Sequence, residues 1–214
     1  MSFENYLCGM FVEINPYNID QRLINQAVEI VKKGGIIIFP TDTVYAIGCD
    51  LYNKKGLQKL ADFKGIKLNK ANFSIICHDL SNLSEYTKQI ERPIFKLLKQ
   101  CLPGPFTFIL DASPNIPKLF DSNKKEIGIR IPNNEITLAI VEKLGNPMAV
   151  TSLHDHEDEI MEYFSDPNAI YERLDEEVDL IIDGGYGNLK GSTIIDCTDG
   201  SPILVREGLG KLPD

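Results

Sequence analysis

Short apolar segments alternate with amphipathic segments along the chain, and this alternation constrains the fold more than any other feature. Helical periodicity occupies residues 21–33, 55–63, 92–101, 134–144 and 167–175. Between these stretches lie runs of three to five mostly apolar residues, typical of buried strands: 36–39, 73–77, 106–110, 127–131, 148–151, 178–182, 193–197 and 203–205. Because helices and strands interleave, the sequence predicts an α/β fold with one twisted sheet and helices outside it.

Local signals support this assignment at the first helix and strand. Asp20 is a suitable N-cap, and Gly34 suits the left-handed residue that ends a helix. The strand at Ile36–Phe39 should stop at Pro40, which lacks a backbone donor. Only turns separate the last strands, so part of the sheet should be antiparallel. With 214 residues and no linker-like tract, residues 1–214 are expected to form a single domain.

The charge of the chain is uneven. The net charge is −9, yet residues 54–70 hold six lysines against the single acid Asp62, a local net of +5. Residues 155–179 hold eleven acids against Arg173. This asymmetry either focuses an anionic ligand on one face or gives two ordinary solvated surfaces.

Composition argues against several classes of protein. The five cysteines are widely spaced and form no C-x-x-C pair, so neither a disulfide framework nor a zinc site is expected. Cys77 and Cys197 end apolar runs and should be buried thiols. No apolar run approaches the roughly 20 residues of a membrane helix, and the first residues lack the pattern of a signal peptide. A cytoplasmic protein without a membrane partner or a protein-held metal is therefore expected.

Two polar segments are candidates for ligand binding. The glycine-rich run at 184–193 matches neither the P-loop nor the G-x-G-x-x-G spacing, which favours a flexible turn. The segment Pro40–Tyr45 directly follows a predicted strand, where α/β sheets often place ligands. Its Thr and Asp side chains are equally suited to capping a turn, so both interpretations remain open.

The run Gly34–Gly48, which reads GGIIIFPTDTVYAIG, resembles the signature of the YrdC-like family of threonylcarbamoyl-AMP synthases. Further matches cover almost the whole chain: Pro103–Thr107, Gly128–Pro132, Thr151-Ser152, Ser192-Thr193 and Val205–Gly208. Residues 21–35 and 72–86 are most similar to the YciO branch. The resemblance implies a single YrdC-like domain with a mixed parallel and antiparallel sheet, flanking helices and a concave ligand cavity.

The resemblance also implies a reaction. L-Threonine and bicarbonate form a carbamate that attacks the α-phosphate of ATP, giving threonylcarbamoyl-AMP and pyrophosphate for the modification of tRNA. Such a nucleotidyltransferase needs cations on the phosphates and accurate positioning. Magnesium would arrive with ATP and be held mainly through phosphate oxygens.

The family's site residues can be placed at single positions of this chain. Lys64 and Thr43 match the catalytic positions, whereas Ser152, Ser192 and Arg206 match those that hold the nucleotide. Substrate-binding positions are matched by Thr43, Thr107 and Arg130. Two interpretations of Arg130 remain open: it forms a buried structural ion pair, or it contacts the ligand.

The chain departs from the family pattern in three places. The family's K-x-R-P reads Lys64-Gly65-Ile66-Lys67 here, so isoleucine replaces a forked arginine donor. The family's T-S-x-N ends in His154, and the acidic run 155–159 follows it. Loss of one such charge partner typically costs roughly a thousandfold in rate.

Two functions are therefore open. The first is an enzyme that makes threonylcarbamoyl-AMP or a related adenylate. The second is a paralogue that only binds nucleotide or RNA. The resemblance implies binding of double-stranded RNA or tRNA through a basic concave face, for which Lys64, Lys67 and Lys70 are the candidates.

Overall fold

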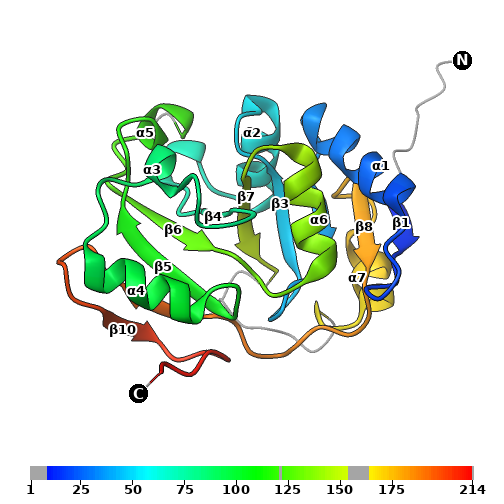
Figure 1. Ribbon diagram of the computed structural model, residues 1–214. Helices are drawn as coiled ribbons and strands as arrows, with labels where there is room; N and C mark the ends of the chain where they lie inside the picture. The colour runs from blue at the N-terminus through cyan, green and yellow to red at the C-terminus, as the bar shows by residue number, and fades with distance from the viewer. Residues whose placement is uncertain (1–8, 121, 154–163, 214) are drawn as a thin grey trace, which may run out of the picture.

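A computed structural model describes residues 9–120, 122–153 and 164–213. Ten strands form one mixed sheet in the order β1-β8-β2-β3-β7-β4-β6-β5-β9-β10 (Figure 1). The strands are β1 (Met10–Glu13), β2 (Ile37–Phe39), β3 (Ala46–Asp50), β4 (Ser74–Ile76), β5 (Phe106–Asp111), β6 (Glu126–Arg130), β7 (Met148–Ser152), β8 (Leu180–Asp183), β9 (Thr193–Asp196) and β10 (Ile203–Arg206). The predicted α/β fold with a mixed sheet is confirmed.

The helices are α1 (Gln21–Lys32), α2 (Lys54–Phe63), α3 (Leu83–Tyr86), α4 (Arg92–Cys101), α5 (Ile116–Leu119), α6 (Glu135–Leu144) and α7 (Pro167–Leu174), with a 3₁₀ turn at Leu68–Lys70. All five predicted helices are present. The short α3 and α5 were not predicted, because four residues carry too little periodicity to be recognised.

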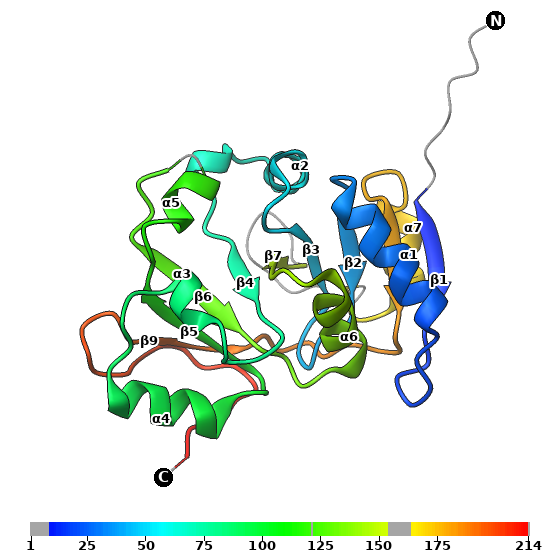
Figure 2. The same ribbon diagram turned by 45° about the horizontal axis from the view of Figure 1, so that its top comes forward.

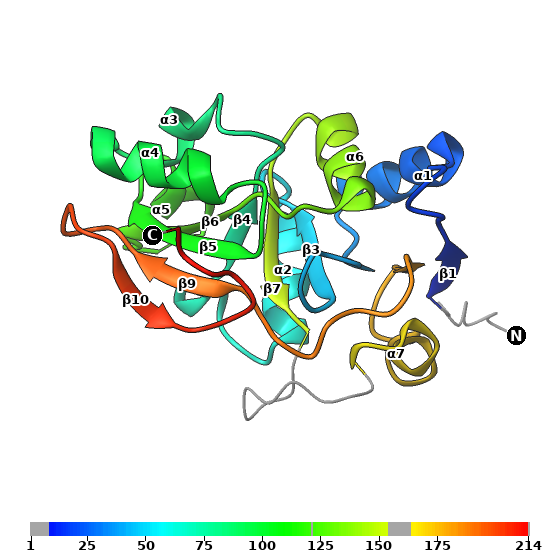
Figure 3. The ribbon, with the colours of Figure 1, turned by 60° about the horizontal axis from the view of Figure 1, so that its bottom comes forward.

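The ends of α1 confirm the predicted capping. The Asp20 carboxylate accepts a hydrogen bond from the Arg22 backbone N–H at 2.9 Å, and Gly34 adopts φ +84° just past the helix. The buried stripe of α1 joins α6, β2 and β8 in one of the two hydrophobic clusters. In Figure 3, α1 and α6 lie on one side of the sheet and α7 on the other.

Two strands that the sequence did not reveal complete the sheet. Strand β3 pairs antiparallel with β2, with Ile38 opposite Ile47, so Pro40–Tyr45 is the turn of a hairpin. All five residues of β3 are buried, although Gly48 and Asp50 have low strand propensity. Strand β1 is a short edge strand that pairs in parallel with β8. Strand β3 therefore forms because it pairs with β2 and β7 on either side, despite the low strand propensity of Gly48 and Asp50.

The opposite edge of the sheet is formed by β10, which pairs antiparallel with β9 as expected for closely spaced strands. Figure 2 shows β9 and the C-terminal segment beside α4. Strand β10 carries Ile203, Leu204 and Val205, with exposures of 54%, 52% and 57%. Its register is interrupted between Leu204 and Arg206, a bulge of the kind that protects edge strands from further pairing.

The cysteines in the described part of the chain are buried free thiols, namely Cys49, Cys77, Cys101 and Cys197. Burial raises the pKa of the Cys77 thiol to about 12 and that of Cys197 to about 11. The interpretation of Cys77 and Cys197 as buried structural thiols is confirmed. Cys8 lies outside the described residues.

Lys124 ties the loop before β6 to the chain before β4. Its ammonium donates a hydrogen bond to the Phe73 carbonyl at 2.9 Å and lies 4.9 Å from the centre of the Phe120 ring. Burial lowers the pKa of Lys124 to about 8 from its ordinary value of 10.5.

This lowered pKa predicts a dependence of stability on pH. Between about pH 8 and 10.5 the unfolded chain keeps the Lys124 proton while the folded protein has released it, so this residue's contribution to the free energy of unfolding rises with pH. We expect denaturant titrations to show that wild type gains stability over this interval relative to Lys124→Met. Lys125→Met, at the exposed neighbouring position, should follow the wild-type profile. Identical profiles for all three proteins would contradict the prediction.

Candidate functional site

The Pro40–Tyr45 turn is held by its own threonines. The Thr41 hydroxyl accepts the Thr43 backbone N–H at 3.0 Å and donates to the Val44 carbonyl at 2.7 Å. The Thr43 side chain is fully buried. Thr41 therefore fixes the shape of the turn, and this shape sets the direction of the Asp42 carboxylate and the Thr43 hydroxyl.

Arg130 reaches this turn from the end of β6. Its Nη2 donates to the Thr43 hydroxyl at 2.9 Å and to Asp42 Oδ1 at 3.3 Å. The other carboxylate oxygen of Asp42 accepts the backbone N–H of Asn133 at 2.9 Å. Arg130 is only 3% exposed, so the ion pair that the sequence left open is present and buried.

Burial dominates the electrostatics of the pair. Burial raises the pKa of Asp42, and the Arg130 charge and the Asn133 N–H oppose the rise. Burial also lowers the pKa of Arg130; the Asp42 charge opposes this, whereas the nearby positive charge of Arg206 acts in the same direction. Burying both charges of such an ion pair costs desolvation energy, and the attraction between them offsets only part of this cost. Two guanidinium groups lying near each other favour an anion between them.

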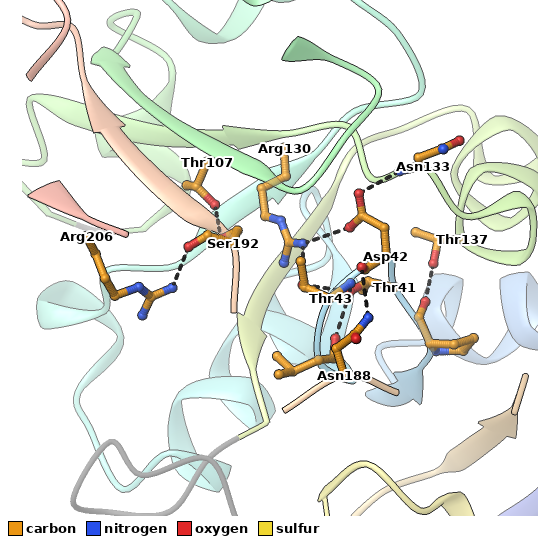
Figure 4. Close-up of polar contacts among 12 residues, drawn as sticks. Thr41, Asp42, Thr43, Thr107, Arg130, Asn133, Thr137, Asn188, Ser192 and Arg206 are labelled. Atoms are coloured by element: carbon orange, nitrogen blue, oxygen red, sulfur yellow. Dashed lines mark hydrogen bonds and ion pairs between the residues drawn. The ribbon is translucent and has the colours of Figure 1, made fainter. Parts of the chain in front are cut away.

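A second group of polar residues lies on β5, on β10 and at the residue just before β9. The Thr107 and Ser192 hydroxyls form a hydrogen bond of 2.7 Å, and Arg206 Nη2 donates to the Ser192 carbonyl at 3.1 Å. Figure 4 shows Arg130 between this group and the Asp42–Thr43 turn. Five of the predicted residues, Thr43, Thr107, Arg130, Ser192 and Arg206, therefore lie in one region, although the sequence separates them widely.

Gly208 allows the chain after Arg206 to cross the start of β9. A Cβ atom at this position would lie 2.3 Å from the Ser192 carbonyl carbon and 2.4 Å from the Gly191 carbonyl oxygen. Thr193 holds the crossing by accepting the Gly208 N–H at 2.9 Å and donating to the Gly210 carbonyl at 2.7 Å. The glycine therefore fixes Arg206 against Ser192.

Arg130 Nε is a buried N–H group that has no hydrogen-bond acceptor among the described residues. Buried N–H groups are nearly always paired in proteins, and an unpaired one needs an explanation such as an absent ligand. A guanidinium presents parallel N–H donors that match the two oxygens of a carboxylate or phosphate. Arg130 can therefore hold Asp42 and Thr43 and still offer a donor to an oxyanion.

Asn188 belongs to the site as well, but the sequence did not reveal it. Its backbone N–H donates to the Thr43 carbonyl at 2.9 Å and its side chain to the Asp42 carbonyl at 3.3 Å. The hydroxyl of Tyr45 adds a second clamp by donating to the Gly185 carbonyl at 2.7 Å. The glycine-rich run lies between β8 and β9, as the sequence predicted, and these hydrogen bonds hold part of it against the Pro40–Tyr45 turn. The signal for Asn188 that the sequence did offer is its position shortly before the Ser192-Thr193 motif.

The other predicted residues occupy separate places. Ser152 is half-buried at the end of β7, opposite Ala46 of β3. Lys64 caps the C-terminal end of α2 and is half-buried, and its part in the same cavity stays a prediction. Lys67 and Lys70 are exposed, whereas Lys59 of the same basic segment contacts Asp179 at 3.1 Å. His154 and the acidic run 155–159 lie outside the described residues.

Neither a metal cluster nor a membrane span is found where the structure is described. Residues 9–120, 122–153 and 164–213 contain no group of three His, Cys, Asp or Glu side chains placed to hold a metal ion. Over the same ranges, none of the helices is both long and apolar enough to cross a membrane.

Comparison with known proteins decides the family. The sequence profile of the Sua5/YciO/YrdC family, described as "Telomere recombination", matches residues 29–208. The chain belongs to this family. YciO of Escherichia coli K12, a protein described as uncharacterized, is 45% identical over 205 residues, which are 95% of this chain and 98% of YciO. The crystal structure of E. coli YciO superimposes with a TM-score of 0.85 over 95% of this chain and 97% of that one.

More distant members of the family carry a named activity. A putative threonylcarbamoyl-AMP synthase of Methanocaldococcus jannaschii is 33% identical over 207 residues, 92% of each chain. The structure of Sua5 from Pyrococcus abyssi in complex with L-threonine matches with a TM-score of 0.82 and 25% identity, over 93% of this chain and 57% of that one. The resemblance to the YrdC-like family and to its YciO branch is confirmed.

Proposed function

We propose that this member of the Sua5/YciO/YrdC family binds an adenine nucleotide and places a carboxylate or carbamate against its α-phosphate. The observation that carries the proposal is the buried Arg130, which leaves Nε without an acceptor beside the Thr107–Ser192 pair and Arg206. Displacement at phosphorus requires accurate positioning and positive charge more than covalent help from the protein. The arrangement supplies both.

Each residue then has a role. Thr43 and Thr107 offer hydroxyls to an amino acid such as L-threonine, and Arg130 offers its free N–H to the carboxylate. Ser192, Arg206 and Ser152 hold the nucleotide, and Lys64 places a cation at its phosphates. Mg²⁺ enters with ATP through the phosphate oxygens. The complex of P. abyssi Sua5 with L-threonine supports the amino acid as the second substrate.

The test is release of pyrophosphate from ATP with threonine and bicarbonate, each omitted in turn, together with calorimetric binding of ATP and AMP. We expect both nucleotides to bind, with turnover far below ordinary enzyme rates, on the order of 1 per second. Release that requires threonine and bicarbonate identifies a synthase, whereas binding alone identifies a nucleotide-binding paralogue. Absence of binding for both nucleotides refutes the proposal.

A second candidate function is binding of double-stranded RNA or tRNA. Lys70 lines a mainly polar cavity of about 440 Å³ together with Lys124, so two distant segments bring their lysines together. Lys67 is exposed near Lys70, at the start of the same 3₁₀ turn. Clustered lysines on a surface that also has amide and hydroxyl groups suit the phosphates of a duplex.

Salt dependence tests this candidate. If the lysines contact phosphates, the affinity for duplex RNA should fall steeply as salt rises, because binding releases counterions. Replacing Lys64, Lys67 and Lys70 with alanine should reduce the slope of log Kd against log salt by up to about three. Replacing Lys32, Lys33 and Lys143, which lie at the C-terminal end of α1 and on α6, is the matched control and should leave the slope unchanged. If the affinity does not depend on salt, or if binding is retained when Lys64, Lys67 and Lys70 are replaced, the result argues against RNA binding by these lysines.

A further inference from the structure

Lys124, in the loop before β6, lines two cavities of about 440 Å³ each. The first is mainly polar and also contains Lys70, whereas the second extends over the sheet as far as Thr107. Asn72 lines both cavities as well, so Lys124 and Asn72 form a wall that the two cavities share. The Lys124 side chain is half-buried, and small solutes can reach its amine through these cavities.

The amine of Lys124 is anchored by backbone carbonyls. Nζ donates a hydrogen bond to the Phe73 carbonyl at 2.9 Å and a longer one to the Ala71 carbonyl at 3.5 Å. A neutral amine has two N–H groups, which are enough for both carbonyls. Only the Phe120 ring, 4.9 Å from Nζ, specifically favours the charged form. The position of the amine therefore does not require the ammonium form.

The charged groups near this amine come from the 3₁₀ turn and from the start of β6. Lys70 shares the first cavity with Lys124, and Lys125 and Glu126 share the second. Two ammonium groups against one carboxylate suit an anion in this place. Asn69, Asn72 and Asn123 line the first cavity and bring amide N–H donors to it.

The amine is also available as a nucleophile. Burial lowers the pKa of Lys124 to about 8, and the charge of Glu126 opposes this shift. At pH 8 about half of the molecules therefore carry a neutral amine, whereas an ordinary lysine would be neutral in fewer than about one molecule in a hundred. A desolvated lysine amine in its neutral form attacks small electrophiles.

We propose that Lys124 is a site of reversible carbamylation by carbon dioxide. The lone pair of Nζ attacks the carbon of CO₂ and forms an N–C bond, the electrons of one C=O bond move to its oxygen, and Nζ releases a proton to water. The product, –NH–COO⁻, keeps one N–H for the Phe73 carbonyl and gives up the longer contact with Ala71.

Carbon dioxide fits this place because it is small and uncharged on entry, while its product is an anion that the neighbouring lysines and amides favour. Relative to the ammonium form, the reaction changes the charge of the shared wall from positive to negative. The inference goes beyond the two functions proposed above and depends on neither of them.

The test exposes wild type at pH 8 to ¹³C-labelled bicarbonate in equilibrium with CO₂. A trialkyloxonium salt then traps carbamates as esters, and tandem mass spectrometry assigns them to single lysines. A dipeptide, whose α-amino pKa is also near 8, serves as internal standard. We expect Lys124 to be labelled about as much as the dipeptide, and about tenfold or more above its exposed neighbour Lys125.

Two variants extend the test. Lys124→Arg keeps the positive charge without a nucleophilic amine and should lose the ¹³C carbamate signal in NMR spectra, whereas the matched control Lys125→Arg should keep it. Melting temperatures verify that both fold. At constant CO₂ pressure, labelling of wild type should rise roughly tenfold from pH 7 to pH 9, as the neutral amine increases.

Two results from wild type alone would overturn the proposal: a labelled dipeptide with no label on Lys124, or equal labelling of Lys124 and Lys125. Either result leaves the proposed binding of nucleotide and of RNA standing, because neither of them requires a carbamate at Lys124.

Discussion

Arg130→Met is expected to lower the free energy of unfolding by about 3–5 kcal/mol. The cause is the Asp42 carboxylate, which stays buried and loses its guanidinium partner at 3.3 Å. The same change removes the only guanidinium that contacts the Thr43 hydroxyl among the residues described. Binding of AMP or threonine should weaken by about 2–5 kcal/mol. Urea titration and calorimetry measure the two effects.

A double variant separates stability from binding. Asp42→Asn combined with Arg130→Met removes both charges while retaining an acceptor for the Asn133 N–H, so most of the lost stability should return. Ligand binding should not return, because the free N–H donor of Arg130 is still absent. If the double variant bound ligand as wild type does, Arg130 would be only a structural partner of Asp42.

Ile66→Arg is the second change with a large expected effect. Isoleucine replaces the family's forked donor at this position, and its side chain is 39% exposed on the loop after α2. An arginine therefore has room, and we expect stability to change by no more than about 0.5 kcal/mol. Pyrophosphate release with threonine and bicarbonate should rise by roughly a hundredfold to a thousandfold over wild type, because a guanidinium pairs bidentately with an oxyanion.

Ile66→Lys is the matched control. It supplies charge without the fork, so it should recover much less activity than Ile66→Arg. Lys64→Ala in the Ile66→Arg background should abolish the gain. Wild-type release at about 1 per second or faster would show that this branch does not need the arginine.

The sequence predicted the regular elements because their signals are local. The apolar stripe of α1, its Asp20 cap and the Pro40 stop depend only on residues close in the chain. Strand β3 was missed because Gly48 and Asp50 interrupt the apolar pattern, and its burial comes from β2 and β7 on either side. The conformation of this segment is therefore set by the strands that pair with it, not by its own sequence pattern.

The same distinction holds at the candidate site. Thr43, Thr107, Ser192 and Arg206 were found through motifs, and contacts now bring them into one region. The ion pair of Arg130 was foreseen as an alternative, but its partner Asp42 lies 88 positions away along the chain. No spacing rule connects such residues. Asn188 was missed for the same reason.

The order of strands in the sheet also has a consequence for synthesis of the protein. Strand β8 lies between β1 and β2, and β7 lies between β3 and β4, so the N-terminal strands have no complete neighbours until residues 148–183 exist. Pairings between distant segments form slowly and leave strand edges open in the meantime. On the ribosome, β2 and β3 can pair with each other early, whereas their outer neighbours and the partner of β1 are synthesised only about a hundred residues or more later.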